Sequence, residues 1–403
     1  MAQSQTNQYR LIKTLLIMLY MLLSIVLLLA VNQYFFCPRF VFTKGAAFSG
    51  PDLFNPYAAI KPGHWIKCNF HAHAQGWDGI SNNYEVACSV HNAYQSLHYG
   101  VHCISNHQNI DTTRSGEPNY ISAYEHGYNF TKTHQLVLGS AKVQKLDYIF
   151  TQTTENKQNI INRLSNESNF VALNHPDLSS GYTAKDLCSL SGYDAIEVLN
   201  SKTISTDLWD TALSVGKKAF IIANDDLHNA VTKDQLGNIC TFVNAAENSK
   251  KSVLKALKSG QSYGVIIGRN QNPDTVPYLE KLTTSMDSVC ILMSQPATHI
   301  VLTGQNGKTI QSFKNTNSVK FVLRPAEHYA RATFTYANQT RIYLNPVFFT
   351  DNFTVCQDKA YENVGQTFQF NADGIFILAL WAMMTVKILQ IARRRNLVQA
   401  PFQ

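Results

Sequence analysis

The feature that most constrains the fold is a regular alternation of short apolar runs with longer amphipathic stretches between residues 65 and 269. The apolar runs have the length of buried strands and are too short for helices. They are Trp65–Phe70, Val101–Ser105, Gln135–Leu138, Phe170–Leu173, Ala195–Leu199 and Ala219–Ala223. The stretches predicted as helices are Tyr84–His98, Lys157–Asn166, Asp207–Lys217 and Ser249–Ser259. This alternation predicts an α/β domain with a mainly parallel sheet or barrel.

The character of the sequence changes after Gly260. Residues 276–371 are rich in Thr, Ser, Val and Phe, with short runs typical of strands at Ser288–Met293, His299–Thr303, Ser318–Leu323, Arg331–Tyr336 and Thr340–Phe349. The cluster Gly304-Gln305-Asn306-Gly307 is typical of a turn. We therefore expect an α/β domain over residues 37–270 and a small antiparallel β domain, of the sandwich type, over residues 271–371.

Both ends of the chain carry a long apolar segment. Leu15 to Val31 follows Arg10 and Lys13, whereas Ile375–Ala392 contains Lys387 and is followed by three arginines. Each segment is about long enough to cross a bilayer. A cleaved signal peptide is the alternative for the first segment, and a surface amphipathic helix for the second. Because the cationic flanks lie at the chain ends, the positive-inside tendency predicts that residues 1–36 and 372–403 anchor the chain with cytoplasmic tails. The main domain would then be extracytoplasmic.

Composition narrows the function classes. The net charge of +7 is modest for 403 residues, and no basic stripe suggests nucleic acid as a partner. The eight cysteines form no CxxC pair, which argues against a zinc ribbon or a thioredoxin-like motif. Their even number permits disulfides in an exported domain, but buried free thiols are the alternative, above all for Cys68 and Cys103 in apolar strands.

Residues that can bind metal lie where most of the predicted strands begin or end. In open and closed parallel α/β folds, ligands gather at the carboxyl ends of the strands. The candidate ligands are, in chain order, His71, His73, Asp78, His107, Glu125, His134, His175, Asp226 and His228. Most of them follow a predicted strand, whereas Glu125 and His134 lie on the approach to Gln135–Leu138. Neutral imidazole and carboxylate suit Zn²⁺, Mn²⁺ and Fe²⁺. Nine ligands are too many for one tetrahedral zinc ion, so the set predicts a cluster of two or three divalent metal ions.

These motifs resemble those of the PHP (polymerase and histidinol phosphatase) superfamily over about Lys67–Arg269. The matching elements, in chain order, are His71-Ala72-His73 with Asp78-Gly79, Asn106-His107, Glu125, His134, His175-Pro176 and Asp226-Leu227-His228. The resemblance implies a distorted (β/α)7-type barrel that binds metal ions. It also implies hydrolysis, most readily of a phosphoester, by a hydroxide that bridges two of the ions. His71, His73, Asp78, His107, Asp226 and His228 are then expected to take part in catalysis.

The chain departs from the family pattern at two positions. Asn106 stands where the family usually has aspartate, and Gln261 stands where related amide or carbamate hydrolases usually have arginine. An amide cannot act as a base or carry negative charge, so a metal-binding surface or envelope module without turnover is the alternative function. His126 is adjacent to Glu125 and is the alternative to His134 as the metal ligand that follows this glutamate.

The sequence thus predicts a membrane-anchored, metal-dependent hydrolase, with an amide or carbamate substrate as a further alternative. Its partners would be the membrane and a small-molecule or lipid-linked phosphoester. We expect ordinary surface or core roles for His64, His91, His98, His102, His299 and His328. Arg114 and Lys202 lie on predicted loops, where each is either an anion-binding cation or a solvated charge.

Overall fold

The computed structural model describes residues 2–74, 84–228, 235–272, 274–351, 353 and 360–398. The chain divides into two compact units. The first unit comprises Met1–Val41, Tyr148–Asn159 and Tyr361–Gln403, and the second comprises Phe42–Asp147 and Ile160–Ala360. The predicted site therefore lies in the second unit, whereas both apolar ends of the chain lie in the first.

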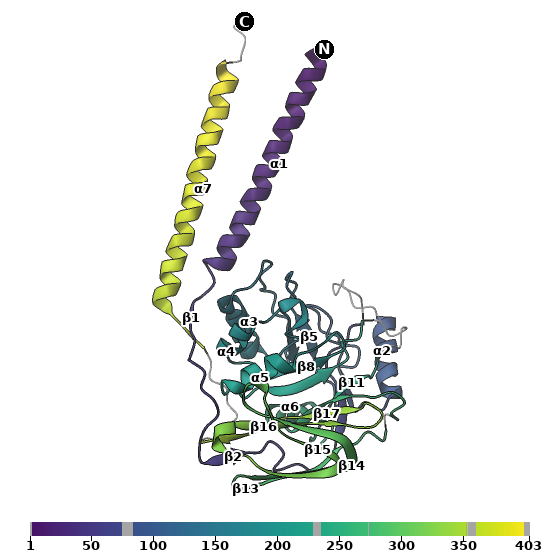
Figure 1. Cartoon of the computed structure of the whole chain (residues 1–403). Helices are drawn as coiled ribbons and strands as arrows, with labels where there is room; N and C mark the ends of the chain where they lie inside the picture. Colours follow the sequence, from purple (N-terminus) through teal and green to yellow (C-terminus); the bar gives the residue numbers. More distant parts are fainter. Residues whose placement is uncertain are drawn as a thin grey trace. The chain divides into compact units, whose positions relative to one another are not determined.

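The first unit contains the two long helices drawn in Figure 1, α1 (Ala2–Tyr34) and α7 (Val364–Val398). Trp381 of α7 stacks on Tyr20 of α1 with ring centroids 5.1 Å apart, and its indole Nε1 donates to Ser24 Oγ at 3.1 Å. A short antiparallel pair joins β1 (Phe40–Val41) to β19 (Tyr361–Glu362). By length and composition alone, Arg10–Tyr34 and Val364–Arg393 are apolar enough to cross a membrane. The predicted terminal helices are thus confirmed as helices, while the side of the membrane on which the main domain lies stays a prediction.

One sheet of the second unit has the strand order β10-β8-β7-β6-β5, with β9 beside β8. The pairs β7–β8 and β8–β10 are parallel, whereas β5–β6 and β6–β7 are antiparallel. This sheet is therefore mixed, which corrects the prediction of a mainly parallel one. Its strands are β5 (Ala123–His126), β6 (Gln135–Leu138), β7 (Phe170–Leu173), β8 (Ala195–Asn200), β9 (Thr203–Ile204) and β10 (Phe220–Asn224).

A second sheet has the order β13-β14-β16-β17-β12-β11-β3-β4, with β15, β18 and β2 attached. The C-terminal strands pair antiparallel, as predicted, but they continue into the sheet that holds β3 and β4. The predicted runs Ser288–Met293 and His299–Thr303 belong to a single strand, β14. The strands are β2 (Asp52–Phe54), β3 (Ile66–Asn69), β4 (Val101–His102), β11 (Ile239–Val243), β12 (Ser262–Ile266), β13 (Leu279–Ser285), β14 (Ser288–Thr303), β15 (Thr309–Val322), β16 (Tyr329–Thr335), β17 (Arg341–Leu344) and β18 (Val347–Thr350).

Two of the shorter helices begin at residues whose side chains cap the helix. Thr183 accepts from the backbone N–H of Asp186 in a capping box, and Ser249 accepts from that of Ser252. The helix that follows Ser249 buries Val253 and Leu257, in keeping with its amphipathic pattern. The helices are α2 (Tyr84–Ser96), α3 (Thr154–Glu167), α4 (Ala184–Ser189), α5 (Thr206–Ser214) and α6 (Lys250–Lys258), with 3₁₀ turns at Leu178–Ser180, Gln305–Gly307 and Pro325–Glu327.

The two sheets are joined by two parallel bridges, one between Ala72 and Leu227 and the other between His107 and Glu125. One buried apolar cluster takes side chains from β3, β4, β5, β6, β7, β8 and β10, among them Cys68, Leu136 and Ile222. These residues form a common core under the strand ends that carry the predicted ligands. The seven strands are assigned to two sheets, so a closed barrel stays a prediction.

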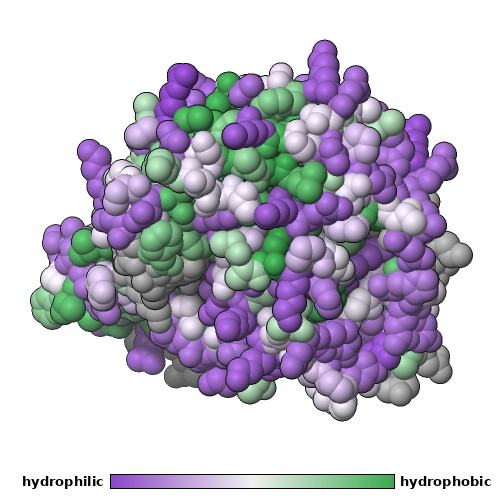
Figure 2. All heavy atoms as spheres, turned by 90° about the horizontal axis from the view of Figure 1, so that it is seen from below, coloured by the Kyte–Doolittle hydropathy of each residue, from purple (hydrophilic) through white to green (hydrophobic). Residues whose placement is uncertain are grey.

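One face of the molecule is mostly polar (Figure 2), and the described cysteines form no disulfide. Figure 2 shows one face of the molecule, which is mostly hydrophilic with small apolar patches between the polar side chains. All seven cysteines within the described ranges are free thiols, and Cys68 and Cys103 are buried as expected. Cys356 lies outside those ranges.

Candidate metal centre

The chain leaves β3 through a segment whose backbone is fixed on both sides. The backbone N–H of Phe70 donates to Asn224 Oδ1 at 2.7 Å, and that of His73 donates to the carbonyl of Leu227 at 2.7 Å. His71 and His73 are consequently buried, with exposed fractions of 0% and 2%. Alternation along an extended chain places both imidazoles on one side.

The other predicted ligands come from the ends of neighbouring strands. His107 follows β4, Glu125 lies in β5, and His134 immediately precedes β6. Two further predicted ligands have unusual backbone conformations. The angle φ is 27° at His175, which follows β7, and 50° at Asp226, which follows β10. Positive φ at residues other than glycine is costly and is concentrated at functional sites.

Four ligand atoms converge at nearly equal spacing. His71 Nε2 lies 3.3 Å from His73 Nε2, and each of these atoms lies 3.3 Å from Asp226 Oδ1. Glu125 Oε2 also lies 3.3 Å from both imidazole nitrogens. Ligands about 2.1 Å from one ion lie roughly 3.0–3.4 Å from each other in octahedral or tetrahedral geometry. The spacing therefore matches the ligand shell of a single divalent ion.

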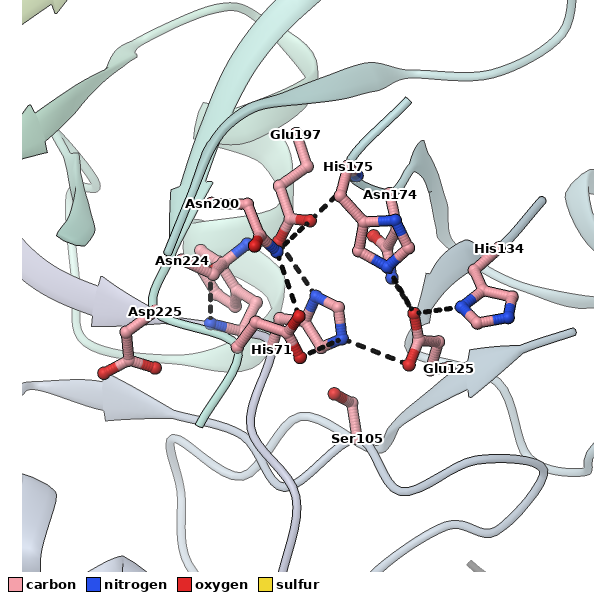
Figure 3. Close-up of polar contacts among 12 residues, drawn as sticks. His71, Ser105, Glu125, His134, Asn174, His175, Glu197, Asn200, Asn224 and Asp225 are labelled. Carbon is pink, nitrogen blue, oxygen red and sulfur yellow. Dashed lines mark hydrogen bonds and ion pairs between the residues drawn. The ribbon is translucent and has the colours of Figure 1, made fainter. Parts of the chain in front are cut away.

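Glu125 connects His71 to two further predicted ligands, His134 and His175 (Figure 3). Its Oε2 faces His71, His73 and His107, all at 3.3 Å. Its Oε1 lies 2.9 Å from His134 Nδ1 and 3.0 Å from His175 Nε2. The carboxylate therefore lies between two sets of imidazoles, which is the position of a bridging ligand. Four overlapping groups of side chains have ligand atoms close enough to hold an ion, namely His73–His107–His228, His71–His73–Asp226, His71–Glu125–His175 and His107–Glu125–His134.

Glu197 orients the centre from behind, a role that sequence analysis missed. Its Oε1 lies 2.9 Å from His71 Nδ1, and its Oε2 accepts from the backbone N–H of His175 at 3.0 Å. A proton on Nδ1 shared with this carboxylate leaves Nε2 of His71 free to bind an ion. The signal in the sequence is the Glu197-Val198-Leu199-Asn200 segment at the end of a buried strand. It resembles a strand-end segment of PHP proteins and, equally, an ordinary polar rim.

Burial and charge move the pKa values at the centre in opposite directions. Burial alone would lower the pKa values of His71 and His73, but the carboxylates of Asp226 and Glu125 beside them raise both. Burial opposes ionisation of Glu125 and Asp226, yet the surrounding histidines bring the pKa of each carboxyl below its usual range. The imidazoles and the carboxylates therefore favour each other's charged forms.

The two more exposed histidines differ from the buried pair. Burial lowers the pKa of His107 to about 3 and that of His228 to about 4, although a neighbouring carboxylate opposes the shift in each case. Both imidazoles are therefore neutral at physiological pH, and neutral imidazole is the form that binds metal. Their side chains are 21% and 36% exposed, so they mark the open side of the centre.

The residues fit divalent ions on structural grounds. Asp226 Oδ1 is buried and has no hydrogen-bond partner, although three imidazoles surround it at 3.3–3.4 Å. A buried carboxylate oxygen without a partner is costly unless an ion or a water satisfies it. Imidazole nitrogen and carboxylate oxygen are ligands for Zn²⁺, Mn²⁺ and Fe²⁺ alike, so the donor set supports a divalent ion without selecting one.

The structure brings together most of the residues predicted from the sequence. His71, His73, His107, Glu125, His134, His175, Asp226 and His228 form the centre, whereas Asp78 lies outside the described residues. The competing His126 bonds instead to Gln135 at 2.8 Å and to the Leu146 carbonyl at 2.9 Å. Arg114 pairs with Glu117, away from the centre, while Lys202 contacts Asp226.

Asn106 has a positioning role in the structure. The side chain is buried, and its Oδ1 accepts from the backbone N–H of Ala74 at 2.9 Å. This contact ties the segment that carries His71 and His73 to the end of β4. An aspartate oxygen could accept the same bond, so this contact does not require the amide.

No protein-family model matches the chain, and no curated protein sequence matches it. Among solved structures, it is similar to a two-domain protein from Bacteroides vulgatus that contains a predicted PHP-like metal-dependent phosphoesterase. The two chains are 13% identical, the match covers 79% of this chain and 99% of that chain, and the TM-score is 0.38. A likeness at this level assigns neither a family nor an activity.

Proposed function

We propose that this chain is a membrane-anchored hydrolase that uses two or three divalent metal ions to cleave phosphoesters. The observation that carries the proposal is the position of Glu125, whose Oε2 faces His71 and His73 while its Oε1 faces His134 and His175. A carboxylate shared between two sets of imidazoles is suited to hold two ions close together. Paired ions are a common device of enzymes that hydrolyse phosphoesters.

Bound ions would supply an acidified water and the neutralisation of charge on the phosphoryl oxygens. The protein's own part is to hold the ligands in place before the substrate arrives. Glu197 keeps a proton at Nδ1 of His71 and aims Nε2 at the centre. His107 and His228 present neutral nitrogens on the open side, where a substrate can approach.

We infer that β3, β4, β5, β6, β7, β8 and β10 form a distorted (β/α)7-type barrel, since their side chains share one core and two bridges join their sheets. The cationic residues outside both apolar segments support cytoplasmic ends and an extracytoplasmic main domain. A substrate there would be a small-molecule or lipid-linked phosphoester. The charge pattern gives no support for nucleic acid as a partner.

Asn106 favours a second candidate function, a surface or envelope module that binds metal without turnover. The amide cannot serve as a base, and its oxygen is engaged by the backbone N–H of Ala74. Under this alternative the ligand set would persist because it stabilises the fold. An amide or carbamate hydrolase would use the same centre and is distinguished only by its substrate.

The test uses the full chain purified in detergent. We expect two or three equivalents of Mn²⁺, Zn²⁺ or Fe²⁺ per chain by elemental analysis, together with turnover of phosphomonoesters or diesters. His299→Ala, a substitution outside the centre, is the matched control for His71→Ala. Metal without turnover across phosphoester, amide and carbamate panels would favour the non-catalytic module. A metal-free chain that His71→Ala leaves unchanged would refute both functions.

A further inference from the structure

The side chain of Lys202 lies at the open side of the metal centre. It comes from the turn between β8 and β9, where its backbone N–H donates to Asn200 Oδ1 at 2.9 Å. Asn200 Nδ2 in turn donates to Glu197 Oε2 at 3.0 Å and to Asp226 Oδ2 at 3.2 Å. Asn200 therefore links the backbone of Lys202 to two carboxylates of the centre, those of Glu197 and Asp226.

The ammonium group contacts the centre without taking a ligand position. Lys202 Nζ lies 3.0 Å from Asp226 Oδ2 and 3.4 Å from His228 Nδ1. The imidazoles of His71 and His73 face the other oxygen, Oδ1. An ion bound at Oδ1 therefore leaves the lysine beside it.

Exposure places the lysine on the side from which a ligand would arrive. The side chain of Lys202 is 31% exposed and that of His228 is 36% exposed, whereas that of Asp226 is only 2% exposed. Within the described ranges, Lys202 is the one lysine or arginine that forms an ion pair with a carboxylate of the centre. This arrangement adds a positive charge beside the candidate metal ligands, on their exposed side.

We propose that Lys202 binds a non-bridging oxygen of the substrate's phosphoryl group and makes the centre prefer phosphomonoesters to diesters. This inference rests on the proposed function. A terminal phosphate carries about −1.5 to −2 charges at neutral pH, whereas a diester carries only one. Lysine binds phosphate as a compact point charge on a flexible stem, so it can follow an oxygen without a fixed planar geometry. An added cation therefore stabilises the more highly charged ester more strongly.

A purely structural role gives a different expectation. If the ammonium served only to neutralise Asp226, its removal would change ion content or folding. The relative use of the two ester classes would stay the same. The discriminating quantity is therefore the ratio of kcat/KM for a phosphomonoester to that for a diester with the same leaving group.

The experiment compares the full chain with Lys202→Met, Lys202→Gln and Lys202→Arg, using p-nitrophenyl phosphate and bis(p-nitrophenyl) phosphate. Lys142→Met is the matched control, because Lys142 pairs with Glu167 outside the centre. We expect the two uncharged variants to retain their ions and to lose about tenfold or more of the monoester-to-diester ratio, mainly through the monoester KM. Lys202→Arg and Lys142→Met should keep most of that ratio. An unchanged ratio in a metal-loaded Met or Gln variant overturns the inference.

Binding of inorganic phosphate to the metal-loaded chain gives a readout that does not need turnover. Calorimetry should show at least about tenfold weaker binding to Lys202→Gln than to the unmodified chain. If the unmodified chain binds ions but cleaves neither ester, the proposed function fails, while the phosphate measurement still tests Lys202. Equal phosphate affinity in the two metal-loaded chains would refute its role in binding.

Discussion

The metal centre and a second histidine cluster in the same unit differ in one instructive respect. The second cluster contains His91, His102, Asp111 and Arg114, and its rings at His91 and His102 are 5.0 Å apart. Its His91–Asp111 contact measures 3.8 Å, and Asp111 is already satisfied by Thr113, whose Oγ1 donates at 2.6 Å. In the metal centre, Asp226 Oδ1 has no hydrogen-bond partner and faces three imidazoles.

Among the described residues, the side chains close enough to hold an ion all belong to the centre, and the second cluster supplies none of them. In the second cluster Arg114 lies 3.4 Å from His102 Nε2 and supplies a positive charge of its own. Burial, reinforced by the charges of His91 and Arg114, lowers the pKa of His102 to about 3. What distinguishes the centre is Asp226 Oδ1, which has no hydrogen-bond partner and faces three imidazoles, while Lys202 contacts only the other oxygen, Oδ2.

Removal of a ligand should separate the two clusters most strongly. We expect His73→Ala to lower ion content and to reduce turnover about a hundredfold or more, because the imidazole contacts two carboxylates of the centre. His91→Ala should change the ion content little. Elemental analysis of both variants checks this expectation. Equal losses would mean that the second cluster also contributes to binding.

Replacement of the orienting carboxylate should have the next largest effect. Glu197→Gln puts an amide where the carboxylate accepts from the backbone N–H of His175 and shares a proton with His71. We expect metal affinity to fall about ten- to a hundredfold, since partners of this kind fix the ligand tautomer. Asp111→Asn in the second cluster is the control. Competition with a chelator measures the metal affinity of both variants. An unchanged affinity in Glu197→Gln would contradict the orienting role of Glu197.

Acid should weaken ion binding at the centre. The pKa values of His71 and His73 are raised, so the metal-free protein keeps protons there that an ion must displace. Apparent affinity should therefore fall as pH drops through these raised values, by about tenfold per pH unit for each proton released. Titrations with a chelator between about pH 6 and 8 should reveal this slope. An affinity independent of pH in that range would show that neither imidazole is protonated before the ion binds.

Introduction of an aspartate at Asn106 should have the smallest effect. Asn106→Asp keeps an oxygen available for the N–H of Ala74, so we expect turnover and metal affinity to change by less than about tenfold. Steady-state kinetics on metal-loaded protein provides the measurement. A larger gain would instead identify the native chain as an enzyme that has lost most of its activity.

The ligand positions were predictable because they depend on local pattern. Short apolar runs fix where strands end, and Gln135–Leu138 and Phe170–Leu173 coincide with β6 and β7. The relative direction of the strands was not predictable. It depends on how the chain turns between β5 and β6, and on which strands become neighbours in the folded sheet. The role of Glu197 was not predictable for the same reason. Its role arises from His71, which is far away in sequence and adjacent only after folding.

The two bridges between the sheets would link the loss of a bound ion to the separation of the sheets. Ala72 pairs with Leu227, and His107 pairs with Glu125, so the pairing that joins the sheets runs through or beside ligand residues. An ion that holds these ligands would also hold the sheets together, and its loss would free the backbone N–H groups of His73 and Gln108, which donate across the join. Hydrogen exchange at these amides would then report on metal occupancy. Separation of the two sheets and release of the ions would then occur together.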